Sequence, residues 1–372
     1  MLLTVLFLAV GIGLSPTRQS PEVAARFDRA FELQRQGLLR EAVEEYRAVV
    51  RAAPDYAEAH ANLGSVLSRL GQGDEAISSY ETALRLNPKL TPVLLNLGII
   101  YFRLGQFTKA ADALERFLAA TPGSAQARGL LGLALVELGR DKDAVPHLEA
   151  TLAVAGEDPA VLYALGLTYL RLDRPEFRKM ADRLAAIPSG GALSHLLLGQ
   201  SLLAKASYQL AVDELQQAAK LNPELPRLHY SLGLSFLMMG DRQQAIASFK
   251  NELDRKPNDF WSLYYLATAH EAEGNDDSAR QYLDAALKLE PKSPEVNGML
   301  GKLLVKQNKY AEALAPLEAA VADPAADSST HYLLARVYQR LGRRKDAERE
   351  FAETERLKGK QLERERSRAL KP

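Results

Sequence analysis

Few side chains in this sequence stand at a spacing that supports catalysis. His270 and Glu271 begin like a zinc-binding HExxH helix, but Ala-Glu-Gly follows, so the second histidine is missing. Neither a GxxxxGKS or GxxxxGKT phosphate loop nor a GxSxG nucleophile elbow is present. The chain has no cysteine, which excludes disulfides, thiolate metal sites and a cysteine nucleophile. These residues predict a protein that is not an enzyme and holds no cofactor.

The histidines invite a metal interpretation, because four of the six occupy equivalent places in a repeated pattern: His60, His195, His229 and His331. Equivalent side chains on neighbouring helical hairpins lie about 8–10 Å apart, whereas one metal ion needs its ligand atoms at about 2 Å. We therefore predict no metal site, and we expect these positions to pack an aromatic-sized ring.

Three other groups of side chains suit the binding of a partner. Arg35, Arg69 and Arg103 share one position in successive repeats, and Arg171 and Arg340 hold it later in the chain. Guanidinium groups in a row suit carboxylates of an acidic segment, although each could equally pair with a local glutamate or be solvated.

The second group is Asn62 and Asn96, whose amides could hydrogen-bond a peptide backbone without reading its sequence. The third group is apolar and aromatic: Tyr230, Leu234, Leu237, Met238, Trp261, Tyr264 and Tyr265. Residues 260–265 hold more large apolar surface than one helix face can bury. We expect Tyr230, Trp261 and Tyr264 to anchor a partner, with packing between hairpins as the alternative.

An internal period of 34 residues positions all of these side chains. Steps of that length from Gly98 reach other small residues, with one repeat shorter by a residue: Ala30, Gly64, Gly98, Gly132, Gly166, Gly199, Gly233, Ala267, Gly301 and Ala335. A small residue at a fixed place in each repeat is typical of two helices that cross closely.

A second series of residues indicates a second helix in each repeat. Alanine lies twelve residues after the small position, except in the fifth repeat, which has Arg178. Four residues further on lies a large residue: Tyr46, Tyr80, Leu114, Leu148, Leu215, Phe249, Leu283, Leu317 and Phe351. Residues four apart share one face of a helix, so this face is predicted to be buried.

Glycine and proline mark where the helices end. Glycine lies seven residues after the small position in most repeats: Gly37, Gly71, Gly105, Gly139, Gly240, Gly274 and Gly342. Glycine there predicts a helix that ends in a left-handed residue, a conformation in which Asn308 is the next best choice and Asp173 and Ala206 fit less well. Proline closes most second helices.

This pattern resembles the tetratricopeptide repeat family over about residues 23–361. Ten repeats begin near Val23, Ala57, Thr91, Ala125, Pro159, Ala192, Pro226, Phe260, Pro294 and Ser328. The resemblance implies an all-α fold, an α-solenoid of stacked antiparallel helical hairpins wound into a right-handed superhelix. It also implies a concave surface built largely from the first helix of each hairpin. The pair Asn62 and Asn96 resembles the asparagine ladder of O-linked N-acetylglucosamine transferases.

The fifth repeat departs most from the pattern, because Pro175, Pro188 and a Ser-Gly-Gly turn replace its usual residues. It is either an irregular hairpin or a hinge. We expect one block of repeats at residues 22–191, a second at residues 192–361, and a charged C-terminal tail at residues 362–372.

The N-terminus, residues 1–20, is an apolar segment. Its core, Leu2–Leu14, is too short to cross a bilayer, which takes about 20 residues, but it suits a signal peptide. No Lys or Arg precedes it. We expect export to the periplasm or outside the cell, with an uncleaved membrane anchor, a misplaced start or a buried helix as alternatives. The membrane would then be a partner only through an uncleaved segment.

Composition and pattern together predict a scaffold. Lysine plus arginine equals aspartate plus glutamate, 47 each, so no general attraction to nucleic acid is expected. We predict that the concave groove binds an extended or helical protein segment through Arg35, Asn62, Arg69, Asn96, Arg103, Tyr230, Trp261 and Tyr264. Family analogy suggests an assembly or adaptor factor of the cell envelope. The alternative is a glycan-binding or polysaccharide-export module, because the aromatic rings could stack on sugars.

Overall fold

The computed structural model describes the backbone of residues 20–369 and the side chains of residues 20–363, and the regular structure there is helical. The predicted N-terminal apolar segment lies outside the described residues, apart from Ser20. The chain divides into an N-terminal unit that ends at Leu197 and a C-terminal unit that begins at Leu198. The boundary falls inside α11 (Gly191–Ala204).

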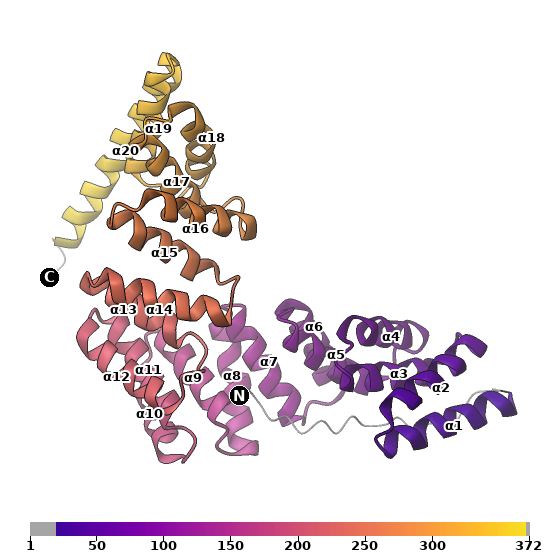
Figure 1. Cartoon of the computed structure of the whole chain (residues 1–372). Helices are drawn as coiled ribbons and strands as arrows, with labels where there is room; N and C mark the ends of the chain where they lie inside the picture. Colours follow the sequence, from indigo (N-terminus) through magenta and orange to yellow (C-terminus); the bar gives the residue numbers. More distant parts are fainter. Residues whose placement is uncertain (1–19, 370–372) are drawn as a thin grey trace. The chain divides into compact units, whose positions relative to one another are not determined.

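The N-terminal unit is a series of antiparallel hairpins in which each helix packs against the next along the chain (Figure 1). Its helices are α1 (Pro21–Arg35), α2 (Leu39–Ala52), α3 (Ala57–Arg69), α4 (Gly73–Leu86), α5 (Thr91–Arg103), α6 (Phe107–Ala120), α7 (Ala125–Glu137), α8 (Asp141–Ala155), α9 (Pro159–Arg171) and α10 (Phe177–Ala186).

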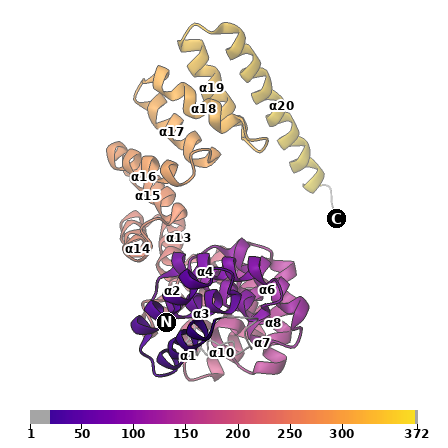
Figure 2. The same cartoon turned by 90° about the vertical axis from the view of Figure 1, so that its right-hand side faces the viewer.

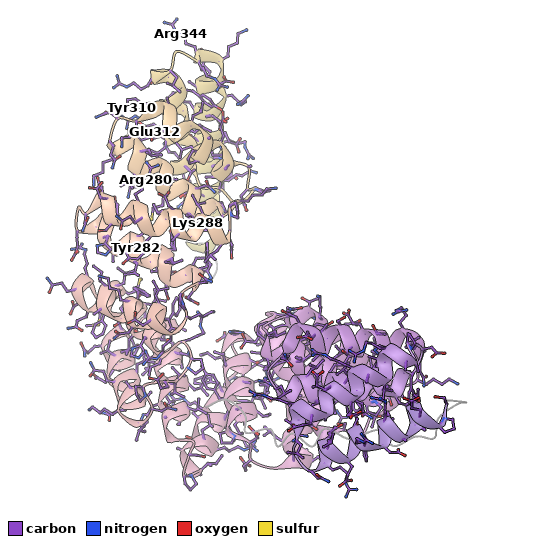
Figure 3. The ribbon with its side chains drawn as sticks, turned by 45° about the vertical axis from the view of Figure 1, so that its right-hand side comes forward. Arg280, Tyr282, Lys288, Tyr310, Glu312 and Arg344 are labelled. Atoms are coloured by element: carbon purple, nitrogen blue, oxygen red, sulfur yellow. The ribbon has the colours of Figure 1, made fainter. Side chains whose placement is uncertain are left out.

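The C-terminal unit repeats this arrangement, as Figure 2 shows for α13 to α20. Its helices are α12 (Tyr208–Leu221), α13 (Leu228–Met239), α14 (Arg242–Arg255), α15 (Phe260–Ala272), α16 (Asp276–Leu289), α17 (Pro294–Lys306), α18 (Tyr310–Val321), α19 (Ser328–Arg340) and α20 (Arg344–Ala369). The second helices α16, α18 and α20 carry the labelled residues of Figure 3, among which Arg280 pairs with Glu312 at 3.6 Å.

The predicted repeat boundaries are confirmed by the helix starts. Seven first helices begin at the predicted residue: Ala57, Thr91, Ala125, Pro159, Phe260, Pro294 and Ser328. The other three, α1, α11 and α13, begin within two residues of the prediction. A pattern of small, large and turn residues was therefore sufficient to place the helices.

The two residue series pack on one another, which confirms the predicted close crossing. A Cβ atom added to Gly98 would lie 2.6 Å from Leu114 Cγ, and one added to Gly301 would lie 2.4 Å from Leu317 Cγ. Both leucines are completely buried. Burial of a side chain of this size stabilises the fold by about 1.5–3 kcal/mol, and it depends on glycine or alanine opposite.

The predicted left-handed helix ends are also confirmed. Each of the seven glycines has a positive φ, and so does Asn308, at 60°. Asp173 and Ala206 adopt the same conformation, with φ of 53° and 57°, although glycine or asparagine would fit it better and alanine disfavours it. The hairpin geometry therefore overrides the local preference at Ala206.

The turn between α10 and α11 is held by hydrogen bonds and does not have the character of a loose linker. The amide of Gly190 donates to the carbonyl of Ile187 at 2.9 Å, and the hydroxyl of Ser194 donates to the carbonyl of Ala181 at 2.8 Å. Gly190 is buried, and an added Cβ would lie 2.1 Å from the carbonyl oxygen of Leu184. Glycine is needed here for close approach.

Candidate functional site

A series of tyrosines spaced by 34 residues marks the first helices of the C-terminal unit. Tyr230 lies on α13, Tyr264 on α15 and Tyr332 on α19, and Gly298 occupies the equivalent position on α17. Tyr332 is 44% exposed, whereas Tyr230 and Tyr264 are more buried. The series is therefore interrupted at one helix.

The rings on α13, α14 and α15 form a connected aromatic cluster. Trp261 contacts Tyr264 edge-on with centroids 5.9 Å apart, and it contacts Tyr265 at 6.1 Å. Tyr265 stacks on Phe249 at 5.7 Å and lies 6.1 Å from Tyr230. Trp261 remains 39% exposed, so the cluster presents an indole to its surroundings.

Tyr230 is more buried than we predicted for a side chain that anchors a partner. Burial raises the pKa of Tyr230 to about 12, and the guanidinium carbon of Arg227 lies 4.3 Å from the centre of its ring. Its backbone amide donates to the carboxylate of Glu252 at 3.1 Å. Glu252, on the facing helix α14, is 5% exposed and caps the first turn of α13. The residue spacing does not predict this contact.

An open hollow of about 470 Å³ lies beside Tyr264, on the same first-helix side. Three first helices, α15, α17 and α19, the α18–α19 loop and Ala320 near the end of α18 supply its walls. Gly298 lies in it, and an added Cβ would meet no atom closer than 3.8 Å. Because glycine replaces the tyrosine of the series on α17, no ring fills the hollow. The interruption of the 34-residue tyrosine spacing could have indicated this hollow from the sequence.

The arginines of the predicted series differ in their surroundings. Arg35 pairs with Glu32 at 3.4 Å, and Arg171 pairs with Asp141 at 3.3 Å. Arg340 lies over the ring of Tyr310 at 5.8 Å. Arg69 and Arg103 are both exposed, and Arg69 has no ion pair among the described residues. Whether the series binds a partner stays a prediction.

The two asparagines lie at different depths. Asn62 is 1% exposed, and its Nδ2 atom has no hydrogen-bond partner in the described part of the chain. Asn96 is half-buried and close to the hydroxyl of Tyr80. Neither amide is displayed on an open surface, and their role in binding a partner also stays a prediction.

The shared histidine position closes the turn between repeats. The Nε2 atom of His60 lies 3.0 Å from the carbonyl oxygen of Pro54, and that of His229 lies 3.2 Å from that of Pro223. Asn297 makes the same contact with Pro291 at 3.1 Å. In these three repeats the position thus places a ring or amide nitrogen next to a proline carbonyl. Within residues 20–363, no three histidine, aspartate or glutamate side chains are grouped so that they could hold a metal ion.

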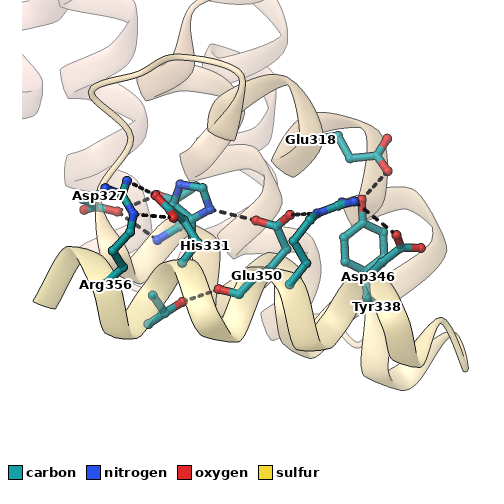
Figure 4. A network of polar contacts seen from close by, with 11 residues as sticks. Glu318, Asp327, His331, Tyr338, Asp346, Glu350 and Arg356 are labelled. Atoms are coloured by element: carbon teal, nitrogen blue, oxygen red, sulfur yellow. Dashed lines mark hydrogen bonds and ion pairs between the residues drawn. The ribbon is translucent and has the colours of Figure 1, made fainter.

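Polar contacts also join the second helix of one hairpin to the first helix of the next. Tyr101 donates to Glu81 at 2.8 Å, and Tyr338 donates to Glu318 at 2.7 Å (Figure 4). In the last hairpin, a ring nitrogen of His331 lies 2.8 Å from the buried carboxylate of Glu350. These contacts are explained by packing and need no ligand.

The helices, their crossings and their open first-helix face define a helical-repeat scaffold. Residues 67–134 and 236–303 match the family Tetratricopeptide repeat, residues 27–90 match a second description of the same repeat, and residues 199–240 match TPR repeat. Together these matches span more than half of the chain. The chain belongs to the tetratricopeptide repeat family, whose members are typically non-catalytic scaffolds for protein–protein interaction.

Individual relatives share only part of this chain. Residues 272–354 match Anaphase-promoting complex, cyclosome, subunit 3. Anaphase-promoting complex subunit 3 of Schizosaccharomyces pombe is 23% identical over 191 residues, which is 51% of this chain and 29% of that protein. BBSome complex member BBS4 of Bos taurus is 25% identical over 165 residues, 44% of this chain and 31% of that protein.

A solved structure, the TPR protein YrrB with an unusual peptide-binding site, is similar at 20% identity and a TM-score of 0.42, over 51% of this chain and 98% of that one. The chain spans about a third of the length of the curated relatives that it matches.

Proposed function

We propose that this protein is a non-catalytic scaffold that binds an extended or helical segment of a partner protein on the first-helix face of its hairpins. One observation supports this most: the only tryptophan, Trp261, is 39% exposed within an aromatic cluster, and Met238 on the neighbouring first helix is 53% exposed. Exposed aromatic and methionine side chains are typical of binding anchors.

Two of the relatives are named as members of multiprotein complexes, which supports protein partners. Trp261, Tyr264 and Tyr230 provide the apolar contacts in this proposal. Arg35, Arg69 and Arg103, in the N-terminal unit, engage carboxylates of the partner, and the amide of the half-buried Asn96 contacts its backbone. Asn62 is too deeply buried to do so in this conformation.

We also propose that the protein acts as an assembly or adaptor factor in the cell envelope. This part rests on the apolar segment Leu2–Leu14, which suits an export signal. In the described residues, no helix combines the length and the apolar character needed to span a membrane.

Capture of the native partner tests the proposal. The protein is tagged at its C-terminus, crosslinked mildly in cells, purified, and compared with a Trp261→Ala, Tyr264→Ala double variant. Leu210→Ala with Leu221→Ala is the matched control, because both leucines are exposed on α12, a second helix. We expect one dominant partner that the double variant loses and the control retains.

A partner lost equally from both variants, or retained by both, contradicts the aromatic face as the binding site. Binding to immobilised polysaccharides that disappears with Trp261→Ala, in the absence of a protein partner, selects the glycan-binding alternative.

A further inference from the structure

The hollow beside Tyr264 differs in charge from the chain as a whole, which is neutral. Four carboxylates line it, from Glu271, Glu295, Asp323 and Asp327, against a single ammonium, from Lys302, so the formal charge of the lining is −3. Its apolar walls are Tyr264, Met299 and Leu333. A basic side chain with an aliphatic stem matches both parts of this lining.

The charges are only partly satisfied within the protein. Lys302 lies 3.2 Å from Glu271, and Asp327 caps α19 through the amide of Thr330 at 2.8 Å. Glu295 accepts one hydrogen bond, from the hydroxyl of Ser293, and Asp323 accepts one, from the amide of Ala325. Carboxylates have several acceptor positions, so Glu295 and Asp323 retain capacity for a donor from outside.

The aromatic wall strengthens this preference. The half-buried Tyr264 lines the hollow, and a guanidinium or ammonium group is attracted to the face of a tyrosine ring. Because Gly298 stands where Tyr230, Tyr264 and Tyr332 stand in neighbouring repeats, no ring from α17 fills the hollow, and only Ala320 and Thr330 approach the glycine, at 3.8 Å from an added Cβ. A volume of about 470 Å³ accommodates a few side chains, not a whole helix.

We infer that this hollow receives a basic side chain, arginine or lysine, from the partner segment. The inference rests on the proposed function, since it specifies the chemistry of the segment that the first-helix face binds. The stem of the basic residue packs on Met299 and Leu333, and its charged end lies near Glu295 and Asp323.

Selection from a random dodecapeptide library displayed on phage, panned on the full chain, tests the inference. Selected peptides are then labelled with fluorescein, and their affinity is measured by fluorescence anisotropy. Three variants are compared with the wild type: Gly298→Tyr, which fills the hollow without a change of charge; Glu295→Gln; and Glu312→Gln. The last removes an exposed carboxylate on α18 that does not line the hollow.

We expect the selected peptides to be enriched in arginine or lysine. Gly298→Tyr should weaken their binding by about tenfold or more, and Glu295→Gln by about threefold to tenfold, since a charged hydrogen bond is lost. Glu312→Gln should leave the affinity within about twofold of the wild type, because an exposed charge outside the site acts only weakly. Thermal melts by circular dichroism verify that each variant is folded. If Gly298→Tyr does not fold, Glu295→Gln alone tests the inference.

Other outcomes separate the two proposals. Peptides that bind without basic residues, or whose affinity is unchanged in both Gly298→Tyr and Glu295→Gln, overturn this inference but leave the scaffold function standing. Equal losses in Glu295→Gln and Glu312→Gln show general electrostatic attraction and also overturn it. Failure to select any peptide, together with the absence of a crosslinked native partner, contradicts both proposals.

Discussion

Replacement of Gly190 by alanine is predicted to disrupt the turn between α10 and α11. The added Cβ lies 2.1 Å from the carbonyl oxygen of Leu184, which is more than 1 Å closer than van der Waals contact of roughly 3.3 Å allows. The obstacle is backbone, so no side-chain rotation can relieve it. The turn has to move, and the hydrogen bonds of Ile187 to Leu184 and of Gly190 to Ile187 are strained with it.

The expected cost follows from these contacts. Overpacking destabilises by about 1–3 kcal/mol, and each weakened hydrogen bond by about 1 kcal/mol. Alanine offsets about 0.4–1 kcal/mol of this, because it lowers the conformational entropy of the unfolded chain. The net destabilisation is about 3 kcal/mol. Gly123→Ala is the matched control, because an added Cβ there meets no atom within 4 Å. It should be neutral or stabilising by about 0.5 kcal/mol.

Native-state hydrogen exchange is the suitable assay, because unfolding of a repeat array is not a single all-or-none step. Gly190→Ala should accelerate hydrogen exchange in α10 and the start of α11 by about a hundredfold. Urea unfolding should show a free energy of unfolding that is lower by about 3 kcal/mol. If both alanine variants exchange within about twofold of the wild type, the packing argument for Gly190 is refuted.

Helix ends and a half-buried histidine also affect stability. Ala206→Gly should stabilise the protein by about 1 kcal/mol in urea unfolding, because it relieves a left-handed residue with φ of 57°; a loss of stability contradicts this. Burial, followed by the charge of Arg255, lowers the pKa of His229 below 6.5, so the unfolded chain binds the proton more readily. The stability contributed by His229 is therefore complete above pH 6.5 and lost as the pH falls below it. His229→Asn, which copies the residue type of the equivalent Asn297, keeps a donor to the proline carbonyl, and its melting temperature should fall less between pH 7 and pH 5; equal slopes contradict this.

Much of the fold could be predicted from residue spacing, because each repeat forms its helix crossing and its helix end with the same types of residue. Glycine or alanine opposite a large buried residue fixed the helix crossings, and glycine with a positive φ fixed the helix ends. Spacing could not show that Asp173 and Ala206 adopt the same conformation. At Ala206 the positive φ is imposed by the two packed helices that the residue joins, against its local preference, whereas aspartate tolerates this conformation better.

The candidate site was harder to predict, since it depends on which side chains neighbouring repeats leave uncovered. The aromatic group was visible in the sequence, but the depth of Tyr230 and Asn62 depends on the facing helices. The cap by Glu252 is a contact between distant residues that no spacing rule contains. The hollow could have been anticipated from Gly298, which interrupts tyrosines at intervals of 34 residues.

Photo-crosslinking from single positions shows whether a partner segment lies along the first-helix face. A benzophenone amino acid replaces Tyr264, Tyr332 or, as the control on an outer second helix, Leu221. After irradiation in native cells, adducts are identified by mass spectrometry. We expect one common partner to be crosslinked at positions 264 and 332 and not at position 221. Crosslinking chiefly at position 221, or to different proteins at 264 and 332, would contradict binding along this face.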